Sequence, residues 1–172
     1  LFRSQFDVVV IDGQGDHETV ARGLMHLRAT PAYATALIYL NHPSDGWSDA
    51  LADGPVPRDA DRIDSAWHQW LVLQQRFRPA VGAGVNQLEQ TLLRWLWLRP
   101  GAWIRPVSDP GSSSVYRYPL VEAFANDPNV HALHWLEQNH LRHDLEPGEL
   151  IDRIRQCPSC RSSRLNYVDL CP

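Results

Sequence analysis

Apolar and polar residues alternate in blocks along the first part of the chain, and these blocks predict a strand, a helix and a second strand. The run near residues 7–11 is continuous and β-branched, which is typical of a parallel strand covered on both faces. Apolar residues recur at helical spacing over 17–30, and a second apolar run occupies 35–40, after Pro31. This order predicts a βαβ unit with two parallel strands.

A long amphipathic helix is expected after the second strand. In the segment PVPRDADRIDSAWHQWLVLQQRF, Asp59 or Asp61 can cap the helix, because a short carboxylate accepts hydrogen bonds from the free amides of a first turn. The apolar residues of the helix share one face, namely Ile63, Trp67, Trp70, Leu71 and Phe77. We expect this face to cover the sheet.

The composition changes midway along the chain. The segment PAVGAGVNQ is rich in proline, glycine and small residues, which predicts a linker at 80–86 between a domain at 1–79 and a second domain at 87–172. The second domain is expected to open with a short apolar helix that ends at Pro100. An extended segment (AWIRPV) and a loop (SDPGSSS) should follow.

Two short helices and a hairpin are expected next. The segments YPLVEAFAN and DPNVHALHWLEQNH each place proline at the first helical position, and Asp127 should cap the second helix. The buried stripe of that helix would be Val130, Leu133 and Leu136. The segment LRHDLEPGELIDRIRQ alternates around a Pro-Gly turn, which predicts a β-hairpin. The predicted fold class is therefore α/β, with a small, winged-helix-like α+β domain in the second half.

The first 79 residues carry a resemblance to a known family. LFRSQFDVVVIDGQGD and LRATPAYATALIYL, followed by ALADGPVP and the long helix, are similar to the second half of a response-regulator receiver domain. The resemblance implies that Asp12 accepts a phosphoryl group, and that a hydroxyl and a lysine lie nearby. Leu40 and Asn41 occupy the hydroxyl position, and the chain has no lysine to neutralise an acyl phosphate. We therefore expect a degenerate, receiver-like remnant, and we favour Asp12 as a turn residue bonded to its own backbone.

Charge limits the classes of partner. The 172 residues carry a net charge of −4, and all 16 basic residues are arginine. The helix that would read DNA in a winged helix has no cation before Arg142, so nucleic-acid binding through it is not favoured. No apolar run approaches the roughly 18 to 20 residues of a membrane span, and the first residues lack a secretion-signal pattern. We expect a cytoplasmic protein with no membrane contact.

Three cysteines lie close together near the end of the sequence. Cys157 and Cys160 form a Cys-x-x-Cys turn that can present two thiolates to one ion, and a short hairpin can return Cys171 to the same ion. This spacing predicts a zinc ribbon at 151–172 in which Zn²⁺ is structural. His140 and His143 are candidates for a fourth ligand, although each alone is better interpreted as a solvated histidine at a helix end.

The second half carries a more specific resemblance. LLRWLWLRPGAWIRPV, YRYPLVEAF, LHWLEQNHLRHDL and DRIRQCPSCRSSRLNYVDLCP are similar to the thaumarchaeal output domain of the first type, over residues 85–172. This resemblance implies a metal-binding output domain of a signalling protein, of a kind often joined to receiver or cyclic-dinucleotide synthase domains.

These features predict a non-catalytic signal-transduction regulatory protein, in which a pseudo-receiver is coupled to a zinc-stabilised output and interaction domain. Its expected partner is a signalling protein or a fused signalling domain, and the seven tryptophans also suit a homodimer interface. A nucleic-acid-binding regulator is the alternative, because four arginines surround the cysteines, namely Arg153, Arg155, Arg161 and Arg164. A metal-dependent hydrolase is disfavoured, because thiolate ligands make zinc a poorer Lewis acid.

Overall fold

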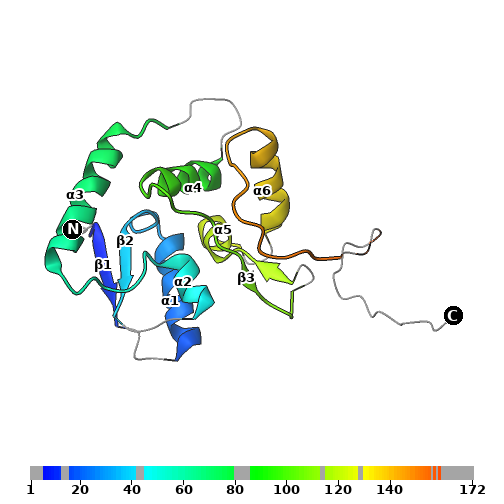
Figure 1. Ribbon diagram of the computed structural model, residues 1–172, viewed down its shortest axis with the longest axis horizontal. Helices are drawn as coiled ribbons and strands as arrows, with labels where there is room; N and C mark the ends of the chain where they lie inside the picture. Colours follow the sequence, from blue (N-terminus) through cyan, green and yellow to red (C-terminus); the bar gives the residue numbers. More distant parts are fainter. Residues whose placement is uncertain are drawn as a thin grey trace.

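The computed structural model describes most of the chain and shows a mixed α/β protein (Figure 1). The described residues are 6–12, 16–41, 45–79, 86–112, 115–127, 130–155, 157 and 159. Within them the chain forms six helices and two sheets of two strands each. None of the helices in these ranges is long and apolar enough to cross a membrane.

The first sheet belongs to a βαβ unit, as the sequence predicted. Strands β1 (Val8–Ile11) and β2 (Leu37–Leu40) are parallel, with Val8 opposite Leu37, and helix α1 (His17–Ala29) connects them. All four residues of β2 are buried, whereas Val10 of β1 is 52% exposed. Among the described residues β1 pairs with β2 alone, so the expected burial of both faces holds for β2 and not for β1.

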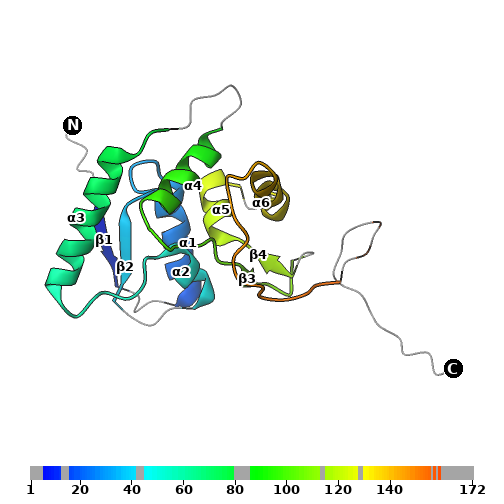
Figure 2. The ribbon, with the colours of Figure 1, turned by 45° about the horizontal axis from the view of Figure 1, so that its top comes forward.

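Helices cover both faces of this sheet. Helix α2 (Gly46–Leu51) is short, and helix α3 (Ala60–Arg76) is the predicted amphipathic helix. Its cap is Asp59, whose side chain accepts a hydrogen bond of 3.0 Å from the amide of Asp61. Figures 1 and 2 show α3 on one side of the sheet and α1 on the other. Accordingly, Trp70 of α3 packs with Leu37 and Tyr39, and the alternate residues of β2 face the core on the side of α1.

The described residues of the second half form three helices and a hairpin. Helix α4 (Gln87–Trp97) is followed by strands β3 (Val107–Ser108) and β4 (Tyr116–Arg117), which are antiparallel, and then by helices α5 (Pro119–Ala125) and α6 (Ala132–Leu141). The apolar helix and the proline at the start of α5 agree with the sequence prediction. The sequence indicated an extended segment and a loop where the structure has the β3–β4 hairpin.

Three expectations for the region around α6 are wrong. The helix begins at Ala132, and its cap position is His131, which makes no side-chain capping bond, so Asp127 does not cap it. Leu133 is 41% exposed instead of buried, whereas Val130 and Leu136 of the predicted stripe are partly buried and pack against the core, and the residues that α6 buries fully are Ala132 and Asn139. The predicted hairpin over 141–156 is also absent from the described residues there, which contain no strand. The winged-helix order is therefore not confirmed.

The physical reason lies in what residues 144–154 contact. We call this stretch the acidic segment. Instead of folding back on itself, it runs beside α5, α6 and the β3–β4 hairpin, as its orange trace shows in Figure 2. Tyr116 of β4 donates a hydrogen bond of 3.0 Å to the carboxylate of Asp152. Alternating segments on either side of a Pro-Gly turn form a hairpin only when they pair with each other. Here the second segment contacts strand β4 instead.

One hydrophobic core includes residues from both sides of the predicted linker. Leu24 and Ile38 of the βαβ unit pack in the same cluster as Leu92 of α4 and Leu120 of α5, and all four are fully buried. Helix α1 lies against α5. The predicted division at 80–86 falls largely outside the described residues and stays a prediction, as does the assignment of the βαβ unit to a receiver.

Candidate functional site

The candidate phosphoacceptor lies at the carboxyl end of β1. Asp12 directly follows the strand, and Asn41 directly follows the neighbouring strand β2, with its amide donating a hydrogen bond of 2.9 Å to the carbonyl of Ile11. The sequence predicted that these two positions would correspond to the phosphoacceptor and the hydroxyl of a receiver. The parallel pairing brings them to one edge of the sheet, but Asn41 has no hydroxyl. The favoured interpretation of Asp12 as a turn residue and the alternative, a phosphoacceptor, both stay predictions.

The candidate metal ligands are only partly described. Cys157 is half-buried, whereas Cys160 and Cys171 lie outside the described residues, as does most of the predicted ribbon at 151–172. Within the described ranges no three histidine, cysteine or acidic side chains are grouped so that they could hold a metal ion. The ring of His140 lies with Nδ1 3.2 Å from the carbonyl oxygen of Leu145. The only support for a zinc site is that the three cysteines can supply thiolate ligands. The zinc site therefore stays a prediction.

A buried ion cluster that the sequence did not reveal connects the two halves of the chain. It consists of Asp53, Arg28 and Arg99, and we call it the Asp53 cluster. Arg28 of α1 donates to Asp53 Oδ2 at 3.1 Å, and Arg99, which follows α4, donates to both carboxylate oxygens, at 3.0 Å for Oδ2. The amide of Ile38 in β2 donates to Oδ2 at 2.7 Å. Asp53 is thus bonded to α1, to β2 and to the end of α4.

The two guanidinium groups of the Asp53 cluster also bind backbone carbonyls. Arg28 donates to Leu51 O at 2.8 Å and to Ala36 O at 2.7 Å, and Arg99 donates to the same Ala36 O at 2.7 Å. Arg99 stacks over the indole of Trp95, with its guanidinium carbon 4.6 Å from the ring centroid. Buried charges are tolerated when they are paired and fully hydrogen-bonded, and the Asp53 cluster meets both conditions.

The electrostatics of the Asp53 cluster follow from this bonding. Burial alone would raise the pKa of Asp53, but the charge and hydrogen bonds of Arg99, followed by the charge of Arg28, outweigh it and hold the pKa below its usual range. Burial lowers the pKa of Arg28 to about 9, so this guanidinium keeps its charge at neutral pH. Because the carboxylate is ionised and bonded to both arginines and the Ile38 amide, its role is to hold elements together and not to transfer protons.

A local signal for the Asp53 cluster was present in the sequence. Arg28 follows Leu24 by four residues, so it shares the apolar face of α1, where an unpaired charge would not be stable. Its partner could not be found in the same way, because Asp53 is 25 residues away and Arg99 is a further 46 residues on. Only the tertiary arrangement brings them together.

A cavity of about 780 Å³ lies between α6, the acidic segment, β4 and the residues that follow α4. Its walls include the aromatic side chains of Trp103, Tyr116 and Tyr118. The pKa of Tyr116 is raised, first by its hydrogen bond to Asp152. The pKa of Tyr118 is raised by burial and by the negative charge of Glu137. Both phenols therefore stay protonated and can donate hydrogen bonds.

Comparison with known proteins identifies a family for the second half of the chain. The model of one family, thaumarchaeal output domain 1, matches residues 83–172, which include α4, the β3–β4 hairpin, α5, α6 and the cavity. No curated protein matches the chain, and no solved structure does. The resemblance of the first 79 residues to a receiver is not confirmed by these comparisons. Because the matched residues are more than half of the sequence, the chain belongs to the thaumarchaeal output domain 1 family.

Proposed function

We propose that this chain is a non-catalytic regulator in signal transduction, in which the βαβ unit is a pseudo-receiver coupled to a zinc-stabilised output domain. Membership of an output-domain family supports the role in signalling. The observation that carries the coupling is the Asp53 cluster. Asp53 and Arg28 precede the residues matched by the family, whereas Arg99 lies within them, at the end of α4.

The physical basis of the coupling is that the Asp53 carboxylate is hydrogen-bonded to several elements at once. A shift of α1 or β2 would lengthen the hydrogen bonds that Asp53 makes with Arg28 or with the Ile38 amide. Leaving a buried charge without partners is costly, so the carboxylate would move with these elements and Arg99 would follow it. Helix α4 packs against α5, and α5 packs against α1, so a displacement at the sheet is transmitted to the output region through packed elements.

The second part of the proposal is a structural zinc site in the output domain. Cys157, Cys160 and Cys171 supply soft thiolate donors at a spacing that suits a structural zinc site. Such a site contributes its binding free energy to the folding of the unit that surrounds it. We therefore assign zinc a structural role in the output domain.

Amide hydrogen exchange of the full chain tests the coupling. Lysine keeps the charge of Arg99 but lacks the planar fork that binds both carboxylate oxygens. We expect Arg99→Lys to accelerate exchange in β2 and α5 as well as in α4. Arg105→Lys is the matched control, because Arg105 is exposed and near in sequence, and it should leave all three elements unchanged. Acceleration confined to α4 would contradict the coupling.

A further inference from the structure

The cavity beside α6 has the size and apolar walls of a small-molecule site. Its volume of about 780 Å³ falls within the range of about 300–1,000 Å³ that is typical of ligand pockets. Leu133 and Leu136 line it from α6, and Trp103 and Ile104 line it from the segment after α4. Tyr118 lines it from the loop before α5. A ligand with an apolar body would therefore contact side chains from several elements.

Exposed apolar side chains concentrate at this cavity. Five large hydrophobic residues that line it are among those the described part of the chain leaves exposed, namely Trp103, Leu133, Leu150, Ile151 and Ile154, at between 37% and 68%. Apolar side chains gathered in one exposed patch mark a binding surface more often than scattered ones do.

The charge of the lining is negative. Five of the residues that line the cavity are acidic and none is arginine, the acidic residues being Glu137, Asp144, Glu146, Glu149 and Asp152. Arg142 forms an ion pair of 3.3 Å with Asp144, but it also pairs with Glu89 at 2.8 Å, outside the cavity. Within the described ranges no arginine forms an ion pair with Glu137, Glu146 or Glu149.

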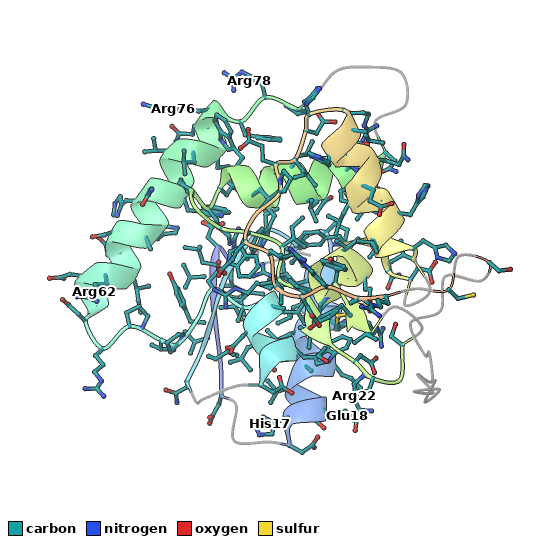
Figure 3. The ribbon with its side chains drawn as sticks, turned by 45° about the vertical axis from the view of Figure 1, so that its right-hand side comes forward. His17, Glu18, Arg22, Arg62, Arg76 and Arg78 are labelled. Atoms are coloured by element: carbon teal, nitrogen blue, oxygen red, sulfur yellow. The ribbon has the colours of Figure 1, made fainter. Side chains whose placement is uncertain are left out.

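No arginine lines the cavity, although Arg153 lies within the acidic segment, and the one residue in the lining that can become a cation is His140. Figure 3 shows Arg62 and Arg76 pointing outward from α3, on the opposite side of the molecule from α6. Arg105 lies nearer, with its guanidinium carbon 5.6 Å from the ring centroid of Trp103, but it does not line the cavity. This contact shows that the ring of Trp103 already lies beside one positive charge, that of Arg105.

We propose that this cavity binds an amphipathic organic cation, a small molecule with an apolar or aromatic body and a positive charge. The body would lie against Trp103 and Leu133, and the charge would lie near Glu137, all three of which line the cavity. An organic anion of the same shape would meet the same apolar walls but would be repelled by the carboxylates. The proposal goes beyond the signalling role and depends neither on zinc nor on the Asp53 cluster.

Two ions of matched shape and opposite charge test the proposal on the full chain. Tetraphenylphosphonium and tetraphenylborate have nearly the same size and apolar surface, and titration calorimetry measures the affinity of each. Each exposed charge pair changes an affinity by about 2- to 5-fold, so three carboxylates should favour the phosphonium by roughly tenfold or more. Equal affinities, or tighter binding of the borate, would overturn the proposal.

Matched variants locate the site. Glu137→Gln combined with Glu149→Gln should weaken phosphonium binding by about fivefold, because it removes two carboxylates from the lining. Glu18→Gln combined with Asp64→Asn makes the same change in net charge at exposed positions on α1 and α3, and it should leave the affinity unchanged. Equal weakening by both pairs would show that the ion responds to net charge alone, and the proposed site would be rejected.

The apolar wall is tested separately. Leu133→Ser should weaken both ions, and because Leu133 is 41% exposed, the variant should keep the circular dichroism spectrum of the parent chain. An unchanged affinity for both ions in a folded Leu133→Ser protein would place the binding outside this cavity.

Discussion

The Asp53 cluster and the cavity lining hold carboxylates in contrasting ways. Asp53 has a side chain that is 9% exposed, and two arginines and a backbone amide bind it. Glu137 and Glu149 are exposed, and no described arginine pairs with them. In the Asp53 cluster the carboxylate already has all its partners. It therefore holds three elements together and cannot bind another partner. In the cavity lining the two glutamates have no arginine partner among the described residues and adjoin apolar side chains. They therefore remain available to a ligand.

The same contrast extends to the apolar residues. Leu92 and Leu120 are fully buried in the shared core, whereas Leu133 and Leu150 remain exposed beside the cavity. Burial of apolar area is the main stabilising contribution to a fold, so the shared core should supply most of the stability. The region around α6 and the acidic segment contributes less and has surface left for binding.

Removal of zinc should have the largest effect, and it should be confined to one region. If the three cysteines hold zinc, their ion contributes on the order of 10 kcal/mol or more to the folding of its own small unit. We expect about one equivalent of zinc in the purified chain, measured by elemental analysis, and its loss in Cys157→Ser. Chelation should accelerate amide exchange near Cys157 while the exchange of α1 and β2 stays slow.

A matched substitution controls this prediction. Ser159→Ala changes a neighbouring residue that is not a proposed ligand, so it should retain the metal. Metal-free protein that keeps the exchange pattern of the untreated chain would contradict the zinc assignment without affecting the shared core.

Breaking the Asp53 cluster should have the next largest effect. Asp53→Ala leaves two buried guanidinium groups without their carboxylate, which is expected to lower the free energy of unfolding by about 3–5 kcal/mol. Urea denaturation followed by circular dichroism measures the loss. Asp64→Ala removes an exposed carboxylate from α3 and should change the free energy by less than about 1 kcal/mol.

Acid provides a second readout of the same cluster. Arg99 and Arg28 hold the pKa of Asp53 below its unfolded value of about 3.9. The stabilisation is therefore present above that value and is lost as the pH falls through the lower folded pKa. Asp53→Asn should lack this part of the acid dependence, so the difference in unfolding free energy between the two proteins should shrink at low pH. A constant difference would indicate that the ionised state of Asp53 is not what stabilises the core.

Truncated leucines compare the two regions directly and should give the smallest effects. Leu92→Ala creates a cavity in the shared core, and we expect it to cost about 2–5 kcal/mol. Leu133→Ala removes an exposed side chain, and its cost should stay below about 1 kcal/mol. Thermal or urea unfolding of both variants measures the contrast. Similar costs would mean that the wall of the cavity is as much a part of the stabilising core as α4 is.

Local patterns in the sequence determined most of the secondary structure. The β-branched run and helical spacing predicted β1, α1, β2 and α3, and the capping preference of aspartate predicted that α3 starts beside Asp59 or Asp61, of which the structure uses Asp59. These predictions hold because propensity, capping and alternation act over a few residues. The second-half resemblance likewise identified the output-domain family, which the family match confirms.

The tertiary structure decided the contacts between distant segments. It pairs Asp53 with Arg28 and Arg99, it places α4 and α5 in the core of the βαβ unit, and it lays the acidic segment beside β4 instead of folding it into a hairpin. Pairing of this kind depends on which side chains meet across the fold. It cannot be predicted from the periodicity of residues along the chain. The sequence alone therefore determined where the parallel strands and most of the helices form, whereas the fold decided where the β3–β4 hairpin forms, which charges are buried together and which stay open to a ligand.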